Sequence, residues 1–359
     1  MISTIKKLYR QNQQKRKNQA TDGYYRQGAT KAYESLIRQN PDHKLSQKQE
    51  KEIETYAADV LGAASFSTWL KVFTACRGEF LEGWMPLDYL ARIVYPTLNG
   101  SLQPFGKIKT LTKKFLNSEA LPDLAYFVNG SWLTASGQKT NPLALKKILF
   151  DDYPFVFLKQ DHTSQGSGVM KIDKVQFSNL DFNQLGNFVI QSPIIPHELF
   201  KELSPSCVPS LRVTTYKPAQ KDAWVVQSAI RLGLEGVPFI YEDHCIRIGI
   251  RIQDGRTHDF GFFGNWEIVD KHTETGVSIK DRQIPKYEEI KSLCEKLHDQ
   301  NPHFGLIAWD MIVDENDQVK IMEWNTVTPS YNMEEAAIGP HFRGLGWEDL
   351  WKNKNLSHF

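Results

Sequence analysis

Several features that place a protein in a familiar class are missing from this sequence. Its 359 residues include only four cysteines, and no two of them have the Cys-x-x-Cys spacing of a zinc or redox site. Their scattered positions predict free thiols in a reducing compartment. No apolar run approaches the roughly 20 residues that span a bilayer. We therefore expect a cytoplasmic protein with neither a transmembrane segment nor a disulfide framework.

The sequence also lacks an excess of charge of either sign. It has 43 Lys and Arg against 42 Asp and Glu, which gives a net charge of +1 at pH 7. A hydrophobic content of 41% and a charged content of 24% are ordinary for a globular protein. Because no overall field favours nucleic acid, we expect small-molecule partners and no nucleic-acid partner. The sequence leaves the oligomeric state open.

The N-terminal segment is basic and rich in Gln and Lys, and it has no apolar stretch typical of a signal peptide. One interpretation is a solvated helix or a frayed tail. The other is a surface helix that contacts acidic lipid or a partner enzyme, which the spacing of Ile5, Leu8 and Tyr9 weakly favours.

Common nucleotide-binding motifs are absent as well. A predicted strand at 154–159 ends in Lys159 and is followed by the loop Asp-His-Thr-Ser-Gln-Gly-Ser-Gly, which has neither the Walker A nor the Rossmann spacing. Lys159 can nevertheless reach a phosphate as a point charge. The backbone N–H groups around Gly166 and Gly168 can fold over phosphates, or the loop can be an ordinary hairpin turn.

A second predicted hairpin, at 305–325, carries polar residues on otherwise apolar strands. If its turn centres on Asn316 and Asp317, antiparallel pairing brings Asp310 opposite residue 323. Glu323 and Asn325 are two apart and share a face of their strand. Two carboxylates and an amide oxygen suit Mg²⁺, whereas a simple surface hairpin would leave them solvated. The apolar neighbours favour the metal site.

Two further strands each contain one arginine among apolar residues, Arg212 and Arg231. An interior arginine needs an anionic partner. That partner is either a glutamate in a buried ion pair or a ligand phosphate, such as a triphosphate or an acyl-phosphate.

Taken in order, these pieces resemble the ATP-grasp superfamily, and most closely its sugar-transfer-associated family. The similar stretches run from about 153 to 326 and include LKQDHTSQGSGV, FVIQSPIIPHELF, SLRVTTY, AIRLG and GLIAWDMIVDENDQVKIMEWN. The resemblance implies an α+β chain with the ATP-grasp fold, in which two α+β subdomains grip the nucleotide behind a helical N-terminal extension. It divides the chain into a polar helical extension (1–58), a mostly helical lobe (59–150), a small nucleotide-flap subdomain (151–196) and a large subdomain with the metal site and an acceptor-side C-terminal segment (197–359).

The resemblance also implies a site. Lys159 and Lys107, with Lys109 as the fallback, would hold the α- and β-phosphates, and Arg212 and Arg231 would clamp the γ-phosphoryl group. The catalytic set is thus Arg212, Arg231 and Lys159. The remaining expected ligands of ATP are the flap residues Gln165, Gly166, Ser167 and Gly168 and the adenine hinge residues Gln191, Ser192, Ile194 and Ile195. Asp310, Glu323 and Asn325 would bind Mg²⁺, with Mn²⁺ as the alternative ion.

The implied reaction is amide formation between a carboxylate and an amine, with an acyl-phosphate intermediate and ADP as product. A sugar acid and an amino acid of a cell-surface polysaccharide are the substrates that the family suggests. A peptide ligase, a small-molecule kinase and a catalytically silent scaffold in a glycan-assembly complex are the alternatives. Residues 241–250 and 326–351 depart from the family pattern, so the substrates are not carried over with it.

Four histidines stand in or beside these stretches: His162, His197, His244 and His272. A lone histidine is more often structural than catalytic. We single out His272 for testing because its loop matches the family pattern.

Overall fold

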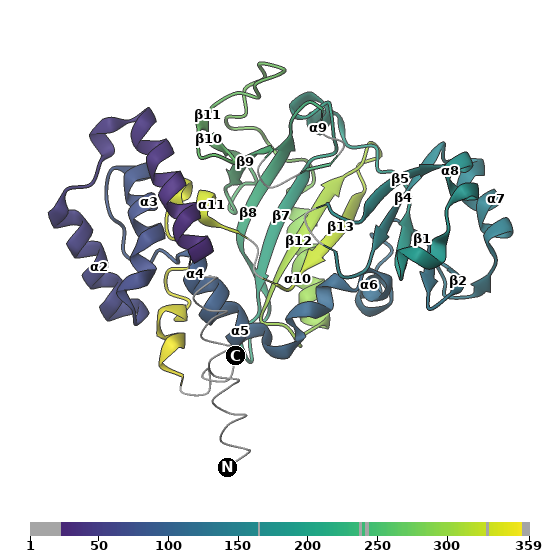
Figure 1. Cartoon of the computed structure of the whole chain (residues 1–359), viewed down its shortest axis with the longest axis horizontal. Coiled ribbons are helices and arrows are strands. Elements are labelled where there is room, and N and C mark those ends of the chain that lie inside the picture. Colours follow the sequence, from purple (N-terminus) through teal and green to yellow (C-terminus); the bar gives the residue numbers. More distant parts are fainter. Residues whose placement is uncertain (1–22, 164–165, 237–238, 241–243, 328–329, 354–359) are drawn as a thin grey trace, which may run out of the picture. The chain divides into compact units, whose positions relative to one another are not determined.

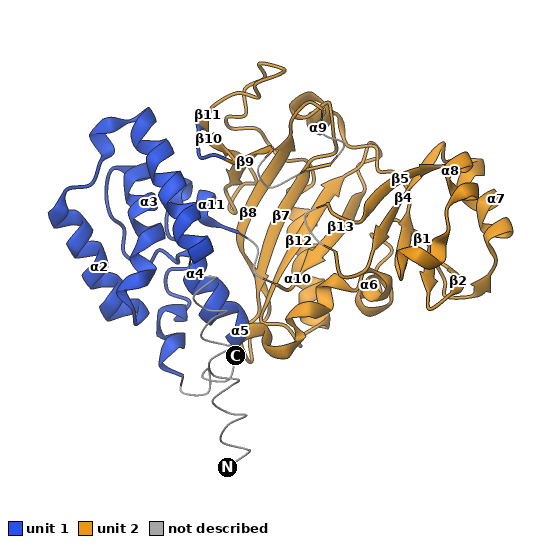
Figure 2. Cartoon of the chain, viewed as in Figure 1, with its two compact units in different colours: residues 1–97, 265–267, 330–359 blue, residues 98–264, 268–329 orange. Residues whose placement is uncertain are grey.

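The computed structural model of the chain describes residues 23–163, 166–236, 239–240, 244–327 and 330–353. The basic segment 1–22 and Gln165 lie outside the described residues. The chain divides into two compact units, coloured separately in Figure 2. Unit 1 comprises residues 1–97, 265–267 and 330–359, and unit 2 comprises residues 98–264 and 268–329.

Unit 1 is helical and draws on both ends of the chain (Figure 1). Residues 23–39 are helical, followed by η1 (Pro41–His43), α2 (Gln47–Leu61), η2 (Ala64–Phe66), α3 (Ser67–Arg77), α4 (Leu87–Tyr89), the π-helical η3 (Leu90–Val94), α5 (Tyr95–Asn99), which runs on into unit 2, α11 (Asn332–Ile338) and η6 (Trp347–Lys352). The start of α2 is fixed by a capping box between Ser46 and Gln49, and its end by Gly62 in the left-handed conformation.

Aromatic residues fill the interior of unit 1. Trp69 and Phe73 are buried on α3, which confirms that they belong to a helix core. Trp84 is fully buried too, but it lies between α3 and α4, outside any helix. Its indole donates to the carbonyl of Glu335 at 2.8 Å, and the Glu335 carboxyl accepts from Met85 N at 3.0 Å. Residues 330–353, which look polar in the sequence, therefore fold against the N-terminal helices.

Unit 2 holds two antiparallel sheets. The six-stranded sheet has the order β3-β2-β1-β6-β4-β5, and the seven-stranded sheet has the order β11-β10-β9-β8-β7-β12-β13. Their strands are β1 (Asp123–Val128), β2 (Ser131–Thr134), β3 (Lys139–Thr140), β4 (Phe155–Gln160), β5 (Val169–Asp173), β6 (Phe188–Gln191), β7 (Ser210–Tyr216), β8 (Trp224–Gly233), β9 (Cys245–Ile250), β10 (Thr257–Phe263), β11 (Ile268–Val269), β12 (Leu306–Val313) and β13 (Val319–Asn325). The helices of unit 2 are η4 (Gly100–Lys107), α6 (Lys109–Leu116), α7 (Pro142–Asp152), α8 (Lys174–Asn179), η5 (Phe182–Leu185), α9 (Glu198–Leu203) and α10 (Tyr287–Gln300).

The seven-stranded sheet has one apolar face and one polar face. Helix α10 packs its apolar stripe, which includes Ile290 and Leu297, on the face that carries Ile307 and Trp309. Side chains alternate along a strand, so the neighbours of Trp309 in the sequence point to the other face. Asp310 is therefore displayed on the face away from α10.

The six-stranded sheet follows the same rule. Helices α7 and α8 cover its apolar face, where Val156 and Leu158 of β4 and Ile190 of β6 are buried. Helix α7 begins as the sequence indicates, because the Asn141 side chain accepts from Ala144 N at 2.9 Å and Pro142 occupies the first turn. Lys159 lies next to Leu158 and points to the uncovered face.

The elements of unit 2 that were not predicted include β2, β3, β11, α8, η5 and α9. Each is six residues or shorter, which is too short for a periodic hydrophobic pattern to emerge. The two compact units also cut the chain at different places from the four segments expected above. Strand β1, from the expected helical lobe 59–150, pairs with β6 in the flap sheet. The four-segment division remains a prediction. Among the described helices, none is long and apolar enough to cross a membrane.

His298 on α10 provides a test of the core of unit 2. It is fully buried between Thr215 Oγ1, at 2.7 Å, and the carbonyl of Phe304, at 2.9 Å. Burial lowers the pKa of His298 from 6.5 to about 4. His298 therefore binds a proton below pH 6.5 in the unfolded chain, but only below about pH 4 in the folded chain.

We predict that the free energy of unfolding falls by about 3 kcal/mol as the pH drops from 6.5 towards 4. Urea unfolding of wild type and of His298→Gln at pH 7 and pH 4 measures this. The variant should lose most of the pH dependence, whereas His303→Gln, at an exposed neighbouring position, should keep it. An unchanged pH dependence in His298→Gln would contradict the assignment.

Candidate functional site

The hairpin of β12 and β13 sets the register of the site. Asp310 pairs directly with Glu323, and the register shifts between Asp310 and Met311. This confirms the predicted pairing across the turn. Trp324 points to the opposite face, where it is buried against Trp309 and Phe304. Neighbouring side chains on a strand point to opposite faces, so the buried Trp324 places Glu323 on the cavity side of the sheet.

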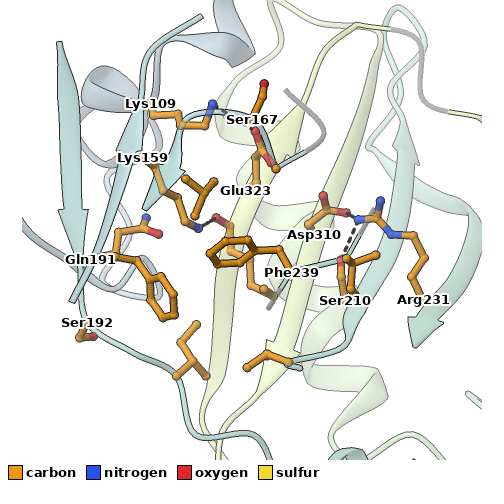
Figure 3. Close-up of a pocket in the computed structure, with 17 residues that line it drawn as sticks. Lys109, Lys159, Ser167, Gln191, Ser192, Ser210, Arg231, Phe239, Asp310 and Glu323 are labelled. Carbon is orange, nitrogen blue, oxygen red and sulfur yellow. Dashed lines mark hydrogen bonds and ion pairs between the residues drawn. The ribbon is translucent and has the colours of Figure 1, made fainter. Parts of the chain in front are cut away.

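One cavity in unit 2 collects most of the predicted site residues (Figure 3). It lies between the uncovered faces of the two sheets. Nine of the predicted residues line it: Lys159, Gly166, Ser167, Gln191, Ser192, Ile194, Arg231, Asp310 and Glu323. The cavity therefore joins residues that are up to 164 positions apart in the chain.

Asp310 is the electrostatic centre of this cavity. Its carboxylate accepts from Arg212 Nε at 2.5 Å and from Arg212 Nη2 at 3.0 Å, and Arg231 Nη2 lies 3.0 Å from it. Asn325 Nδ2 donates to the same carboxylate at 3.3 Å. Burial alone would raise the pKa of Asp310, but the two guanidinium groups lower it to about 2. The expected anionic partner of both arginines is thus an aspartate within the protein.

Arg231 has one buried hydrogen-bond donor without a partner among the described residues. Its Nη2 also donates to Ser210 Oγ at 2.9 Å, but its buried Nε has no hydrogen-bond partner among the described residues. Burial and the charge of Arg212 lower the pKa of Arg231. A buried N–H group without a partner costs about 1–3 kcal/mol. An anionic ligand would remove that cost.

Two lysines lie close to Glu323 in the cavity. Lys109 Nζ lies 3.6 Å from Glu323 Oε1, and Lys159 Nζ donates to the carbonyl of Met322 at 3.3 Å. Burial lowers the pKa of Lys159, and the charge of Glu323 opposes that shift. Figure 3 shows both ammonium groups on the same side of the cavity as Glu323. Lys109, the fallback, therefore lines the cavity, whereas Lys107 does not.

Other predicted residues lie beside the cavity without lining it. Arg212 and Asn325 contact Asp310 from behind. Gly168 has a φ of +72°, and a Cβ there would come within 2.6 Å of Thr163, so the loop requires glycine. Ile195 is 50% exposed and points away. Gln165 lies outside the described residues.

The apolar part of the cavity was missed by the sequence analysis. It is formed by Phe157, Val169, Val208, Phe239, Ile240 and Met322. Strand alternation could have found Phe157, because it is two residues before Lys159 on the same face. Phe239 comes from the segment between β8 and β9, and its ring lies 5.9 Å from that of Phe157. No local pattern marks this segment as part of the site.

The four histidines lie outside the cavity. His162 and His244 are exposed, and His197 caps α9 by accepting from Leu199 N. His272 is fully buried, with Nε2 3.1 Å from the carbonyl of Gly233. None of them lines the cavity, so His272 loses its priority for testing.

A metal ion must fit what the residues offer. Among the described residues, no cluster of three or more His, Cys, Asp or Glu side chains could hold one. Glu323, with a third of its side chain exposed, nevertheless offers carboxylate oxygens to the cavity. Both oxygens of Asp310 already have partners among Arg212, Arg231 and Asn325. Mg²⁺ commonly uses one or two carboxylates and completes its shell with phosphate oxygens and water. The residues fit a Mg²⁺ ion that arrives with a phosphate ligand and takes Glu323 as its main protein ligand.

The comparisons agree with this geometry. Residues 159–345 match the model of a family described as sugar-transfer associated ATP-grasp. The match covers more than half of the chain and gives the protein its class, that of the ATP-grasp proteins, together with their fold. Within this class, the chain belongs to the sugar-transfer associated ATP-grasp family.

The similar solved structures are distant. D-alanine-D-alanine ligase from Coxiella burnetii is 12% identical with a TM-score of 0.39, over 70% of this chain and 58% of that one. D-alanyl-alanine synthetase A from Vibrio cholerae O1 is 14% identical with a TM-score of 0.40, over 79% and 73%. The biotin carboxylase domain of Hydrogenobacter thermophilus 2-oxoglutarate carboxylase is 10% identical with a TM-score of 0.42, over 85% and 57%. This chain thus spans little more than half the length of the first and the third. No curated protein matches the chain.

The two arginines make Asp310 essential to the stability of the site. Replacing Asp310 by Asn removes the charge that two buried guanidinium groups share, and breaking a buried ion pair in this way costs roughly 3 kcal/mol. We predict a loss of this size in the free energy of unfolding, measured with urea at pH 7.

Asp259→Asn is the matched control, because Asp259 forms an exposed ion pair with Lys280 at 3.2 Å in the same sheet. An exposed pair contributes at most about 1 kcal/mol. Equal losses in the two variants would show that Asp310 does not hold the arginines.

Proposed function

We propose that the protein is an ATP-dependent carboxylate–amine ligase that forms an amide through an acyl-phosphate intermediate. The observation that carries the proposal is the charge pattern of the cavity. Four cationic side chains (Lys109, Lys159, Arg212 and Arg231) surround two carboxylates (Asp310 and Glu323) beside an apolar slot. An excess of two positive charges next to an apolar slot suits a nucleotide, with phosphates at one end and a base at the other.

The base would occupy the apolar slot beside β6. Ser192 N donates to the carbonyl of Pro122 at 2.9 Å, and the carbonyl of Ile195 accepts from Glu315 N at 2.9 Å. Those two groups are committed within the protein. The adenine contacts would therefore fall to the carbonyl of Ser192 and the N–H of Ile194, two residues that line the cavity. Phe157 and Met322 would contact the faces of the ring.

The phosphates would extend towards the cations. Lys109, in place of Lys107, and Lys159 would bind the α- and β-phosphates as point charges. Backbone N–H groups of Gly166 and Ser167 would cover them, since Gly166, at φ +76°, adopts a backbone conformation that favours glycine. Arg231, which lines the cavity, would bring its guanidinium group to the transferring γ-phosphoryl group, with Arg212 holding Asp310 in position. Mg²⁺, held by Glu323, Asp310 and Asn325 with the phosphates, would neutralise charge on the oxygens; Mn²⁺ has the same ligand preferences.

The chemistry then balances without a covalent enzyme intermediate. A substrate carboxylate oxygen attacks the γ-phosphorus, and the bond between that phosphorus and the oxygen of ADP breaks. The amine nitrogen attacks the carbonyl carbon of the acyl-phosphate, loses a proton and expels inorganic phosphate. The protein supplies orientation, charge stabilisation and exclusion of water from the acyl-phosphate.

The substrates are the least determined part of the proposal. The family description, sugar-transfer associated, supports a sugar acid or an amino acid of a cell-surface polysaccharide or glycoconjugate. We place the reaction in the cytoplasm, where ATP and free amino acids are present. A peptide ligase, a kinase for a small-molecule hydroxyl group and a silent scaffold are outcomes that the experiment below distinguishes.

We predict that the protein with ATP and Mg²⁺ releases ADP when a suitable carboxylate and amine are both present. A panel of uronic acids, amino acids and dipeptides, with ADP measured by a coupled assay and products by mass spectrometry, tests this. A phosphorylated alcohol among the products would indicate a kinase, and a lengthened peptide a peptide ligase. Failure of the protein to bind ATP by calorimetry would contradict the proposal as a whole.

Glu323→Gln should abolish ADP release in that assay while leaving the fold intact. The substitution keeps the size of the side chain but removes the charge that faces Lys109 and the proposed metal. We expect at least about a hundredfold loss of kcat, in line with the removal of an electrostatic catalytic group. Glu315→Gln, at the exposed turn of the same hairpin, is the control. Near-wild-type activity of Glu323→Gln would remove Glu323 from the site.

A further inference from the structure

Asp161 is a buried carboxylate that the proposed chemistry does not use. It directly follows β4, the strand that carries Lys159, and only 9% of it is exposed. Its Oδ1 accepts from Thr110 N at 3.0 Å, and its Oδ2 accepts from Thr110 Oγ1 at 2.7 Å. Both oxygens are thus directed at the residue that follows Lys109.

Helix α6, which Lys109 begins, depends on this contact. Its own N-cap residue, Ile108, has no side chain that can accept a hydrogen bond. The first N–H groups of a helix need acceptors from elsewhere, and Asp161 supplies one from 51 residues away. His162 N also donates to the carbonyl of Lys107 at 2.8 Å. We call these three bonds, two to Asp161 and one from His162, the α6 latch.

The latch ties the two cavity lysines together. Lys159 stands on β4 two residues before Asp161, and Lys109 stands on α6 next to Thr110. Lys109 Nζ in turn donates to the carbonyl of Thr163 at 2.9 Å, in the loop that leads to Gly166, and lies 3.6 Å from Glu323. The latch thus fixes the start of α6 against the end of β4.

We propose that Asp161 is a positioning residue that holds Lys109 in register with Lys159, so that both ammonium groups meet the phosphates of one bound nucleotide. This inference rests on the proposed nucleotide site. It goes further because it assigns phosphate affinity to a carboxylate that cannot itself attract a phosphate. An anionic residue beside a phosphate site should weaken nucleotide binding by repulsion. Asp161 instead strengthens it, because both carboxylate oxygens bond to Thr110 at the start of α6 and so hold Lys109 in place.

The test compares two probes, ADP with Mg²⁺ and adenosine, on the full chain. ADP affinity is measured by calorimetry, and adenosine affinity by competition against a fluorescent ADP analogue. Asp161→Ala should weaken ADP binding about tenfold, as expected for the loss of hydrogen bonds to a charged group, and should leave adenosine binding within about twofold. Adenosine has no phosphates, so it does not depend on where Lys109 lies.

Four further variants make the test specific. In a Lys109→Met background, Asp161→Ala should add less than about a twofold loss, because two residues that act through one group are not additive. Thr110→Val removes only the hydroxyl bond and should lower ADP affinity less than Asp161→Ala does. Thr110→Ser keeps the hydroxyl group and should have wild-type ADP affinity. Asp173→Ala is the matched control, since Asp173 caps α8 in the same sheet with two N–H bonds but lies away from the lysines.

Each outcome decides the inference. Loss of ADP affinity alone, absent in the Lys109→Met background, supports it. Equal losses for ADP and adenosine, or losses that add to those of Lys109→Met, would overturn it, as would wild-type ADP affinity in Asp161→Ala. Should Asp161→Ala fail to fold, the Thr110→Val and Thr110→Ser pair decides in the same way. Wild-type protein that binds neither probe would overturn the proposed function, and the inference with it.

Discussion

The site depends on the sharing of one carboxylate, Asp310, between two buried guanidinium groups. Desolvating Arg212 and Arg231 is costly, and a single aspartate that accepts from both makes it tolerable. The two arginines carry one positive charge more than Asp310 neutralises. The sheet register directs that excess charge towards the cavity. The sheet that positions the arginines can therefore be formed before any ligand binds.

The second constraint is that the cavity has walls from two different sheets. The chain segment between unit 1 and β1 connects them at both ends. Asn99 Nδ2 donates to the carbonyls of Leu306 and Thr326 at 2.8 Å, which anchors η4 at the ends of β12 and β13. At its other end the segment meets Asp161 of the flap sheet. Lys109 lies between these anchors in the chain, so its position depends on both sheets.

The sequence revealed the site residues whose chemistry is local and missed those whose role is set by distant contacts. Asp310, Glu323 and Asn325 could be placed together because one hairpin turn fixes their register. Lys109 could not be preferred over Lys107, because the choice depends on Asp161, which is far away in the chain. The strands and the long helices were predictable from alternation and from caps such as Asn141, whereas the joining of residues 330–353 to the N-terminal helices left no periodic signal.

Charge balance connects the cavity to the proposed reaction. The four cations and two carboxylates leave two positive charges, and ATP with one Mg²⁺ carries two negative charges near neutral pH. The nucleotide with its metal would therefore bring the cavity close to neutrality, which lowers the cost of excluding water from it. Free ATP would leave an excess of negative charge beside Glu323, and a metal alone would add to the positive charge. The proposed site thus favours the nucleotide and its metal as one ligand.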